Sequence, residues 1–118
     1  MSIPYLKNIE HEKILDLCSL VEYSEGQVVS RTLAQNSAVS ITLFAFDENE
    51  EISSHSSTGD AMLTVLDGKA KITIGDQVFS LNAGETIVMP AGIPHAVAAE
   101  QRFKMQLTVV FPFPQPGV

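Results

Sequence analysis

The pattern of hydrophobic residues after Gly26 is the feature that most constrains the fold of this chain. Apolar and polar residues alternate in short segments between positions 27 and 111, and Asn, Asp, Gly and Pro residues separate these segments. Alternation with a period of two residues is typical of half-buried β-strands. The predicted strands cover residues 27–34, 37–46, 61–66, 69–74, 77–81, 85–89, 95–99 and 103–111. Parallel strands need crossovers of about a dozen residues, so these short breaks favour an antiparallel sandwich or barrel.

Turn-forming residues occupy the breaks between the predicted strands. Gln35 with Asn36, Asp67 with Gly68, and Gly75 with Asp76 are examples. Such residues tolerate the backbone conformations that tight turns require, and we expect at least two of the breaks to be tight hairpins.

Residues 8–23 carry the only helical pattern in the chain. Their apolar residues recur roughly every 3.6 positions, and Asn8 has the residue type of an N-cap. This pattern predicts one short helix. Cys18, the single cysteine, lies within it and has no partner for an internal disulfide, so we expect a buried, unreactive side chain.

Length and charge limit the domain organisation and the partners. A chain of 118 residues fits one domain, which we divide into a helix and lead-in (1–26), a barrel (27–111) and a proline-rich tail (112–118). The net charge of −7 disfavours nucleic acid and anionic lipid as partners. No apolar run reaches the roughly 20 residues of a membrane-spanning helix, and no signal-peptide pattern opens the chain. We therefore expect a soluble cytoplasmic protein without membrane or nucleic-acid partners.

The segment 84–95 is built to deliver a histidine to the start of a strand. Gly84 permits a left-handed turn, Pro90 and Gly92 form a rigid corner, and Pro94 favours an extended residue before it. His95 then opens the strand 95–99 with a fixed direction. If it faces the interior, it needs a polar partner there.

These residues resemble the second motif of the cupin superfamily, G(X)5PXG(X)2H(X)3N. Gly84, Pro90, Gly92 and His95 match in register, and Ala99 stands where the asparagine usually does. The resemblance covers roughly residues 37–111 and implies a jelly-roll barrel, also called a double-stranded β-helix, in an all-β antiparallel fold.

The first cupin motif, G(X)5HXH(X)3-4E(X)6G, is matched in part. His55 and Gly68 stand in place. The departures are Asn49 for the leading glycine, Ser57 for the second histidine, and Ala61 or Met62 for the glutamate.

The resemblance implies that His55 and His95 come from neighbouring strands and point into one barrel mouth. The complete family site offers three imidazoles and a carboxylate to a divalent metal, whereas only two imidazoles remain here. The metal ligands predicted are therefore His55 and His95, for iron, nickel, zinc or manganese. The residues predicted to line a ligand pocket are His55, Ser57, Asp60, Met62, His95 and Met105. No catalytic residue is identified.

Two functions follow from this partial site, and both stay open. One is a non-catalytic protein that binds a small molecule and whose metal site has decayed to a polar rim. The other is a metal-dependent cupin enzyme, an oxygenase or isomerase that acts on a small organic substrate. Unpaired edge strands, such as the valine-rich segment 27–34, favour pairing with another chain, and the resemblance to small cupins implies a homodimer.

Overall fold

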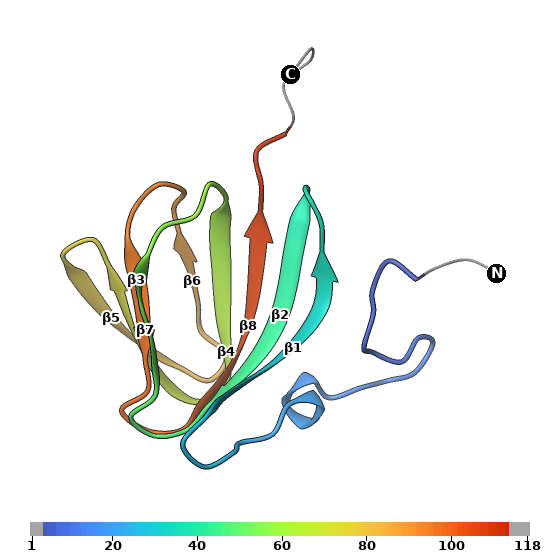
Figure 1. Cartoon of the computed structure of the whole chain (residues 1–118). Coiled ribbons are helices and arrows are strands. Elements are labelled where there is room, and N and C mark those ends of the chain that lie inside the picture. Colours follow the sequence, from blue (N-terminus) through green and yellow to red (C-terminus); the bar gives the residue numbers. More distant parts are fainter. Residues whose placement is uncertain (1–3, 114–118) are drawn as a thin grey trace.

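The computed structural model describes residues 4–113 and consists of one curled antiparallel sheet (Figure 1). Its elements are the 3-10 turn η1 (Leu17–Leu20) and the strands β1 (Val28–Gln35), β2 (Val39–Phe46), β3 (Glu51–His55), β4 (Asp60–Ile74), β5 (Gln77–Asn82), β6 (Thr86–Met89), β7 (His95–Ala98) and β8 (Phe103–Val110). The strand order is β1-β2-β8-β4-β7-β3, and β5 and β6 also pair with β4. Every pairing is antiparallel, which confirms the all-β fold expected from the sequence.

The long strand β4 joins the two walls of the half-barrel. Its first half pairs with β6 and β8, and its second half pairs with β5 and β7. The register shifts between Val65 and Asp67, where the strand bends. The prediction of two strands with a turn at Asp67 and Gly68 was therefore wrong, because the chain bends there without leaving the sheet. Gly75 and Asp76, by contrast, do form a tight hairpin between β4 and β5.

Alternate residues on the inner faces of both walls form the main core. Its fully buried members include Phe46, Leu63, Val65, Ile72, Met89, Phe103 and Met105. Figure 1 shows that the loops β3–β4 and β6–β7 lie together at one end of the half-barrel, which we call the open end. The loops β2–β3 and β7–β8 lie at the other end, which we call the closed end.

The N-terminal strap, residues 7–23, covers part of the outer face of the β1–β2 wall. Val21, Leu17 and Leu20 pack against Leu33 and Leu43 in a second apolar cluster. The strap is bound through its backbone. The guanidinium of Arg31 donates to the carbonyl oxygens of Asn8 and Leu20, and the ammonium of Lys104 donates to that of Cys18.

The predicted helix over residues 8–23 is wrong, since η1 is the only helical turn among the described residues. Asn8 is not an N-cap. It has a φ of 59° and its side chain donates to the carbonyl of Thr32. Helices this short gain little from local propensity alone, and here hydrogen bonds to the barrel fix an irregular path. Cys18 is half-buried, and its thiol donates to the carbonyl of Leu66.

Two further predictions concern the C-terminal tail and membrane-spanning helices. Pro112 and Phe113 follow β8 without regular structure, and the rest of the predicted tail, 114–118, lies outside the described residues. Within residues 4–113, no helix is long and apolar enough to cross a membrane.

Candidate functional site

Two histidines lie side by side at the open end of the half-barrel. His55 ends β3 and His95 begins β7, and the two are cross-strand partners. Their ring centroids are 4.4 Å apart, with an angle of 65° between the ring planes. The register shift between Ile52 and His55 brings the last residue of β3 into this pairing. The two imidazoles thus lie close enough to contact one ligand atom together.

The corner before His95 is held by its own turn and by residues of the β3–β4 connection. The amide of Ile93 donates to the carbonyl of Pro90, and Gly92 has a φ of 77°, as a tight turn with glycine at its third position requires. The amide of Gly92 donates to the carbonyl of Ser57, and the amide of Ala91 donates to the carboxylate of Asp60. These contacts fix the corner against the β3–β4 loop, and therefore fix His95 relative to His55.

Hydrogen bonds to the backbone set the orientation of both rings. Nδ1 of His55 lies 3.0 Å from the carbonyl oxygen of Ser53, and Nδ1 of His95 lies 3.3 Å from that of Ile93. A carbonyl oxygen can only accept, so each Nδ1 carries a proton and donates it. In a neutral ring, Nε2 is then left with a lone pair. Each histidine therefore offers one acceptor or metal-binding nitrogen.

The two histidines differ in burial. His95 is 4% exposed and is the only buried polar or charged residue among the described residues, whereas His55 is exposed. Burial lowers the pKa of His95 from its ordinary value of 6.5, and the neighbouring His55 lowers it further. His95 is thus held neutral near pH 7, on the wall of the half-barrel, with His55 at the rim.

The other predicted pocket residues lie in different places. Ser57 is next to the pair in sequence, but its hydroxyl accepts from the amide of Gly59 within a local turn. Asp60 holds the corner through Ala91. Met62 is 46% exposed on the outer face of β4, and Met105 is fully buried opposite Val65, deeper in the core. The structure brings together His55 and His95, with Ser57 near them, and does not bring Met62 to the pair.

The metal-binding set of the family does not fit this chain. Ala61, at the position of the usual carboxylate, faces the interior and is 1% exposed beside its partner Met89. The hydroxyl of Ser57, which replaces the second imidazole, is already engaged. Residues 4–113 contain no cluster of three or more histidine, cysteine or acidic side chains that could hold a metal ion. Two imidazoles alone make a weak metal site.

A mainly apolar hollow lies one strand away from the histidine pair and was not predicted from the sequence. Its volume is about 640 Å³. Asp76 and Gln77 line it together with the apolar residues Ile74, Phe79, Ile87, Val88, Pro90 and Ile93. Ile74 is the cross-strand partner of His95 on β4, and Gln77 is the partner of Ile74 on β5. His55, His95, Ile74 and Gln77 therefore form one row across four strands. The alternation of apolar and polar residues along the two segments could have indicated that Phe79 and Ile87 face inward. It could not have indicated that a gap separates their strands.

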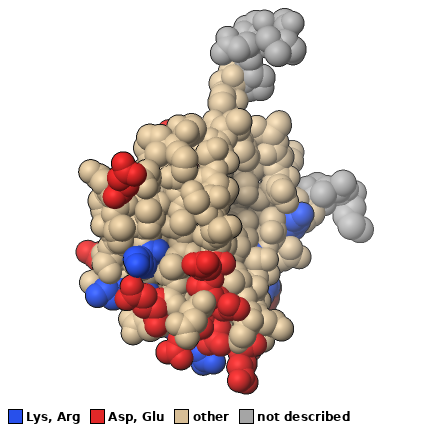
Figure 2. All heavy atoms as spheres, turned by 60° about the vertical axis from the view of Figure 1, so that its left-hand side comes forward, with Lys and Arg blue, Asp and Glu red and all other residues tan. Residues whose placement is uncertain are grey.

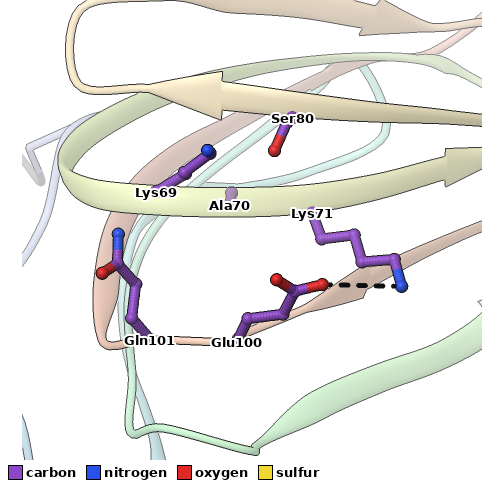
Figure 3. Close-up of a pocket in the computed structure, with 6 residues that line it drawn as sticks. All are labelled: Lys69, Ala70, Lys71, Ser80, Glu100 and Gln101. Atoms are coloured by element: carbon purple, nitrogen blue, oxygen red, sulfur yellow. Dashed lines mark ion pairs between the residues drawn. The ribbon is translucent and has the colours of Figure 1, made fainter.

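A second hollow, of about 390 Å³, lies elsewhere and is polar (Figure 3). Lys69 and Lys71 of β4, Ser80 of β5 and Glu100 are among its lining residues. Glu100 pairs with Lys71 at 3.6 Å, and the side chains are 78% and 44% exposed, respectively. A solvent-exposed pair of this kind contributes little stability. Lys69 and Lys71 precede Ile74, the partner of His95 on β4, and neither histidine lines this hollow.

The family of the chain follows from its matches. Residues 42–111 match the family model described as Cupin domain. A conserved protein of unknown function from Streptococcus pyogenes is 48% identical over 97% of this chain and 100% of that chain, with a TM-score of 0.94. No curated protein matches the chain.

Two further solved structures carry the family name. A cupin superfamily protein from Desulfitobacterium hafniense is 39% identical over 91% of this chain and 98% of that chain, with a TM-score of 0.87. A cupin 2 conserved barrel domain protein from Leptotrichia buccalis is 41% identical over 81% of this chain and 47% of that chain, with a TM-score of 0.80. The chain belongs to the cupin family.

Proposed function

We propose that this protein binds a small molecule at the open end of its barrel, with the His55–His95 pair as the polar anchor. The observation that carries the proposal is the pair itself, with ring centroids 4.4 Å apart and each Nδ1 donating to a backbone carbonyl. The fixed rings leave two Nε2 atoms of known orientation for a ligand. Small-molecule sites typically combine apolar walls with a few such placed polar groups.

The difference in burial gives the two histidines different parts in binding. His95 is on the wall, so a ligand that reaches it is largely removed from water, and a hydrogen bond there is not weakened by competing solvent. His55 is at the rim, where its ring covers an edge of the ligand. Replacing His95 should therefore reduce affinity more than replacing His55.

A metal-dependent enzyme is the second candidate. The free Nε2 atoms favour it, since a histidine ligand normally donates its other ring nitrogen to a carbonyl or carboxylate, as both rings do here. The absence of a carboxylate at Ala61 counts against it, because no acidic side chain offsets the charge of a divalent ion. Iron, nickel, zinc or manganese would then depend on the two imidazoles and on ligands from solvent or substrate.

Elemental analysis separates the two candidates. Protein purified without chelator should contain far less than one metal ion per chain, and small molecules should raise its melting temperature at fixed metal content. His95→Ala should abolish that rise. Stoichiometric iron, nickel, zinc or manganese that disappears in both His55→Ala and His95→Ala would favour the metal-dependent enzyme instead.

The homodimer implied by the family resemblance is a separate proposal. β1 is an edge strand in this sheet, and Met62, Val88 and Val110 are exposed on the outer faces of β4, β6 and β8. These surfaces support association with a second copy. Sedimentation velocity across a range of protein concentrations tests it, and a monomer at all concentrations would exclude a stable dimer.

A further inference from the structure

The chemistry of the open end points to a particular class of ligand. On the face shown in Figure 2, most charged side chains gather toward the closed end of the half-barrel, and few lie toward the open end. The segments 35–40, 54–62, 74–78 and 87–95 surround the open end and contain no Lys or Arg. Their only acidic residues are Asp60, which already binds the amide of Ala91, and Asp76 at the tip of the β4–β5 hairpin, which lines the apolar hollow. No cationic side chain is therefore present there to bind an anion.

The apolar hollow lies where the two walls of the sheet do not meet. β5 and β6 both pair with β4 but not with each other, so a seam remains between them. Phe79 of β5 and Ile87 of β6 line this seam, and Pro90 and Ile93 of the corner close one side. At about 640 Å³ the hollow is large enough for an aromatic ring system.

The hollow is one strand away from the histidine pair in the sheet register, and neither histidine is among its lining residues. Ile74 lines the hollow and is paired with His95, so the two side chains are neighbours on adjacent strands. Adjacent strands are about 4.8 Å apart. A molecule whose apolar part contacts Ile74, Phe79 and Ile87 can therefore place a polar group beside Nε2 of His95. That nitrogen is an acceptor, because Nδ1 donates to the carbonyl of Ile93.

From these observations we infer that the ligand is a mainly apolar small molecule without a negative charge but with a hydroxyl or N–H group, whose apolar part occupies the hollow and whose donor meets Nε2 of His95. This inference rests on the proposed function and narrows it to a ligand class. An anionic ligand is disfavoured by the lack of basic side chains at this end and by the net charge of −7.

Three matched probes test the ligand class. Indole has an N–H donor and no charge, 1-methylindole lacks the donor, and indole-3-carboxylate carries a negative charge. Binding is followed by titration with NMR detection of the backbone amides and of the nitrogens of both imidazole rings. Indole should bind about fivefold more tightly than 1-methylindole, the usual effect of one hydrogen bond, and at least about tenfold more tightly than indole-3-carboxylate.

Variants of the hollow test the place of binding. Ile87→Glu puts a charge into the seam and should weaken indole binding at least about tenfold. Ile93→Glu is a second variant that tolerates the charge more easily, because Ile93 is 40% exposed at the corner, and it should weaken binding in the same direction. The matched control is Val78→Glu, which changes a residue of β5 that is 60% exposed and does not line the hollow. It should leave binding unchanged.

The outcomes distinguish this inference from the proposed function. The inference is overturned if indole-3-carboxylate binds best, if no indole binding is detected up to the solubility limit, or if Ile87→Glu and Ile93→Glu bind indole as the unmodified protein does. The proposed function survives any of these results if a probe still shifts the ring nitrogens of His95 and His95→Ala abolishes its binding. If instead both histidine variants bind indole normally while the hollow variants do not, the proposed function is wrong, and the inference is overturned as well, because the donor does not meet Nε2 of His95.

Discussion

Ala61 is the residue that separates this site most clearly from the metal-binding set of the family. Its methyl group faces the interior beside Met89, and no room is left for a solvated carboxylate. Ala61→Glu should destabilise the chelator-treated protein by about 3–5 kcal/mol, because it buries an unpaired charge. If the His55–His95 pair can hold a metal, added Zn²⁺ or Ni²⁺ should recover much of that loss. Thermal unfolding with and without metal measures both effects.

Ala61→Gln is the control for that experiment, since glutamine has the size of glutamate but no charge. It should be destabilised as well, but metal should not recover its stability. An equal response of both variants to metal would mean that the new carboxylate does not join the histidines.

Substitution of Gly68 tests how much a glycine of the motif contributes to stability. Gly68 has a φ of 76°, and a Cβ there would overlap the carbonyl oxygen of Arg102. Gly68→Ala should cost at least about 3 kcal/mol, from the left-handed backbone and the clash together. Gly84→Ala is matched, with a φ of 90° but nothing within 4 Å, and should cost only about 1 kcal/mol. Urea unfolding gives both values, and equal losses would show that the contact with Arg102 relaxes.

The sequence predicted some residue positions well, because alternation and turn chemistry act locally. Gly84 has the positive φ expected of it, and Gly92, in the corner predicted with Pro90, has a positive φ as well. Asn49, at the position of a motif glycine, also has a positive φ of 70°, and its amide donates to the carbonyl of Ala99, the other motif departure. The positions of Asp60 and Met62 also follow from alternation, since both are on the opposite face of β4 from Ala61. Consistent use of that rule would have left Met62 out of the pocket.

At the scale of elements, the N-terminal strap is held by polar groups that the hydrophobic pattern does not reveal. Arg31 and Lys104 stand on strands, and their side chains donate to carbonyls of the strap. The helical period in residues 8–23 did not indicate the structure of this segment, because Ile14, one of its apolar residues, is fully exposed. The side chains that fix the segment by hydrogen bonds belong to the strands β1 and β8. Likewise the bend in β4 could not be distinguished from a hairpin, because both use Asp and Gly.

Arg31→Met should release part of the strap. The guanidinium donates to the carbonyls of Asn8 at 2.6 Å and Leu20 at 2.9 Å, so its loss should cost about 1–3 kcal/mol. Hydrogen exchange should increase for amides of residues 8–21 and stay slow in β4 and β7, since the strap is outside the main core. Lys13→Met is the control, as Lys13 pairs only with exposed Glu10 and should change stability by less than about 0.5 kcal/mol. Uniformly faster exchange would mean that the strap and barrel unfold together.

At the scale of the whole molecule, the two ends of the half-barrel respond to acid in different pH ranges. At the open end, the pKa of His95 is lowered from 6.5. At the closed end, two hydrogen bonds to the Asp47 carboxylate, from the Gly26 amide and from Arg102 at 2.7 Å, are the main causes that lower its pKa from 3.8 to about 2. In both cases the unfolded chain binds a proton at a higher pH than the folded chain does. Each group therefore stabilises the fold above its unfolded pKa and loses that contribution as the pH falls.

Acid unfolding should consequently show two ranges of decreasing stability in chelator-treated protein. The free energy of unfolding should fall below about pH 6.5 through His95 and fall again between about pH 4 and pH 2, in part through Asp47. Urea unfolding at a series of pH values measures this profile. His95→Gln should remove the upper decrease and keep the lower one, whereas Asp47→Asn should reduce the lower decrease and keep the upper one. A profile for His95→Gln that still falls between pH 7 and pH 5 would show that another group is responsible for the upper range.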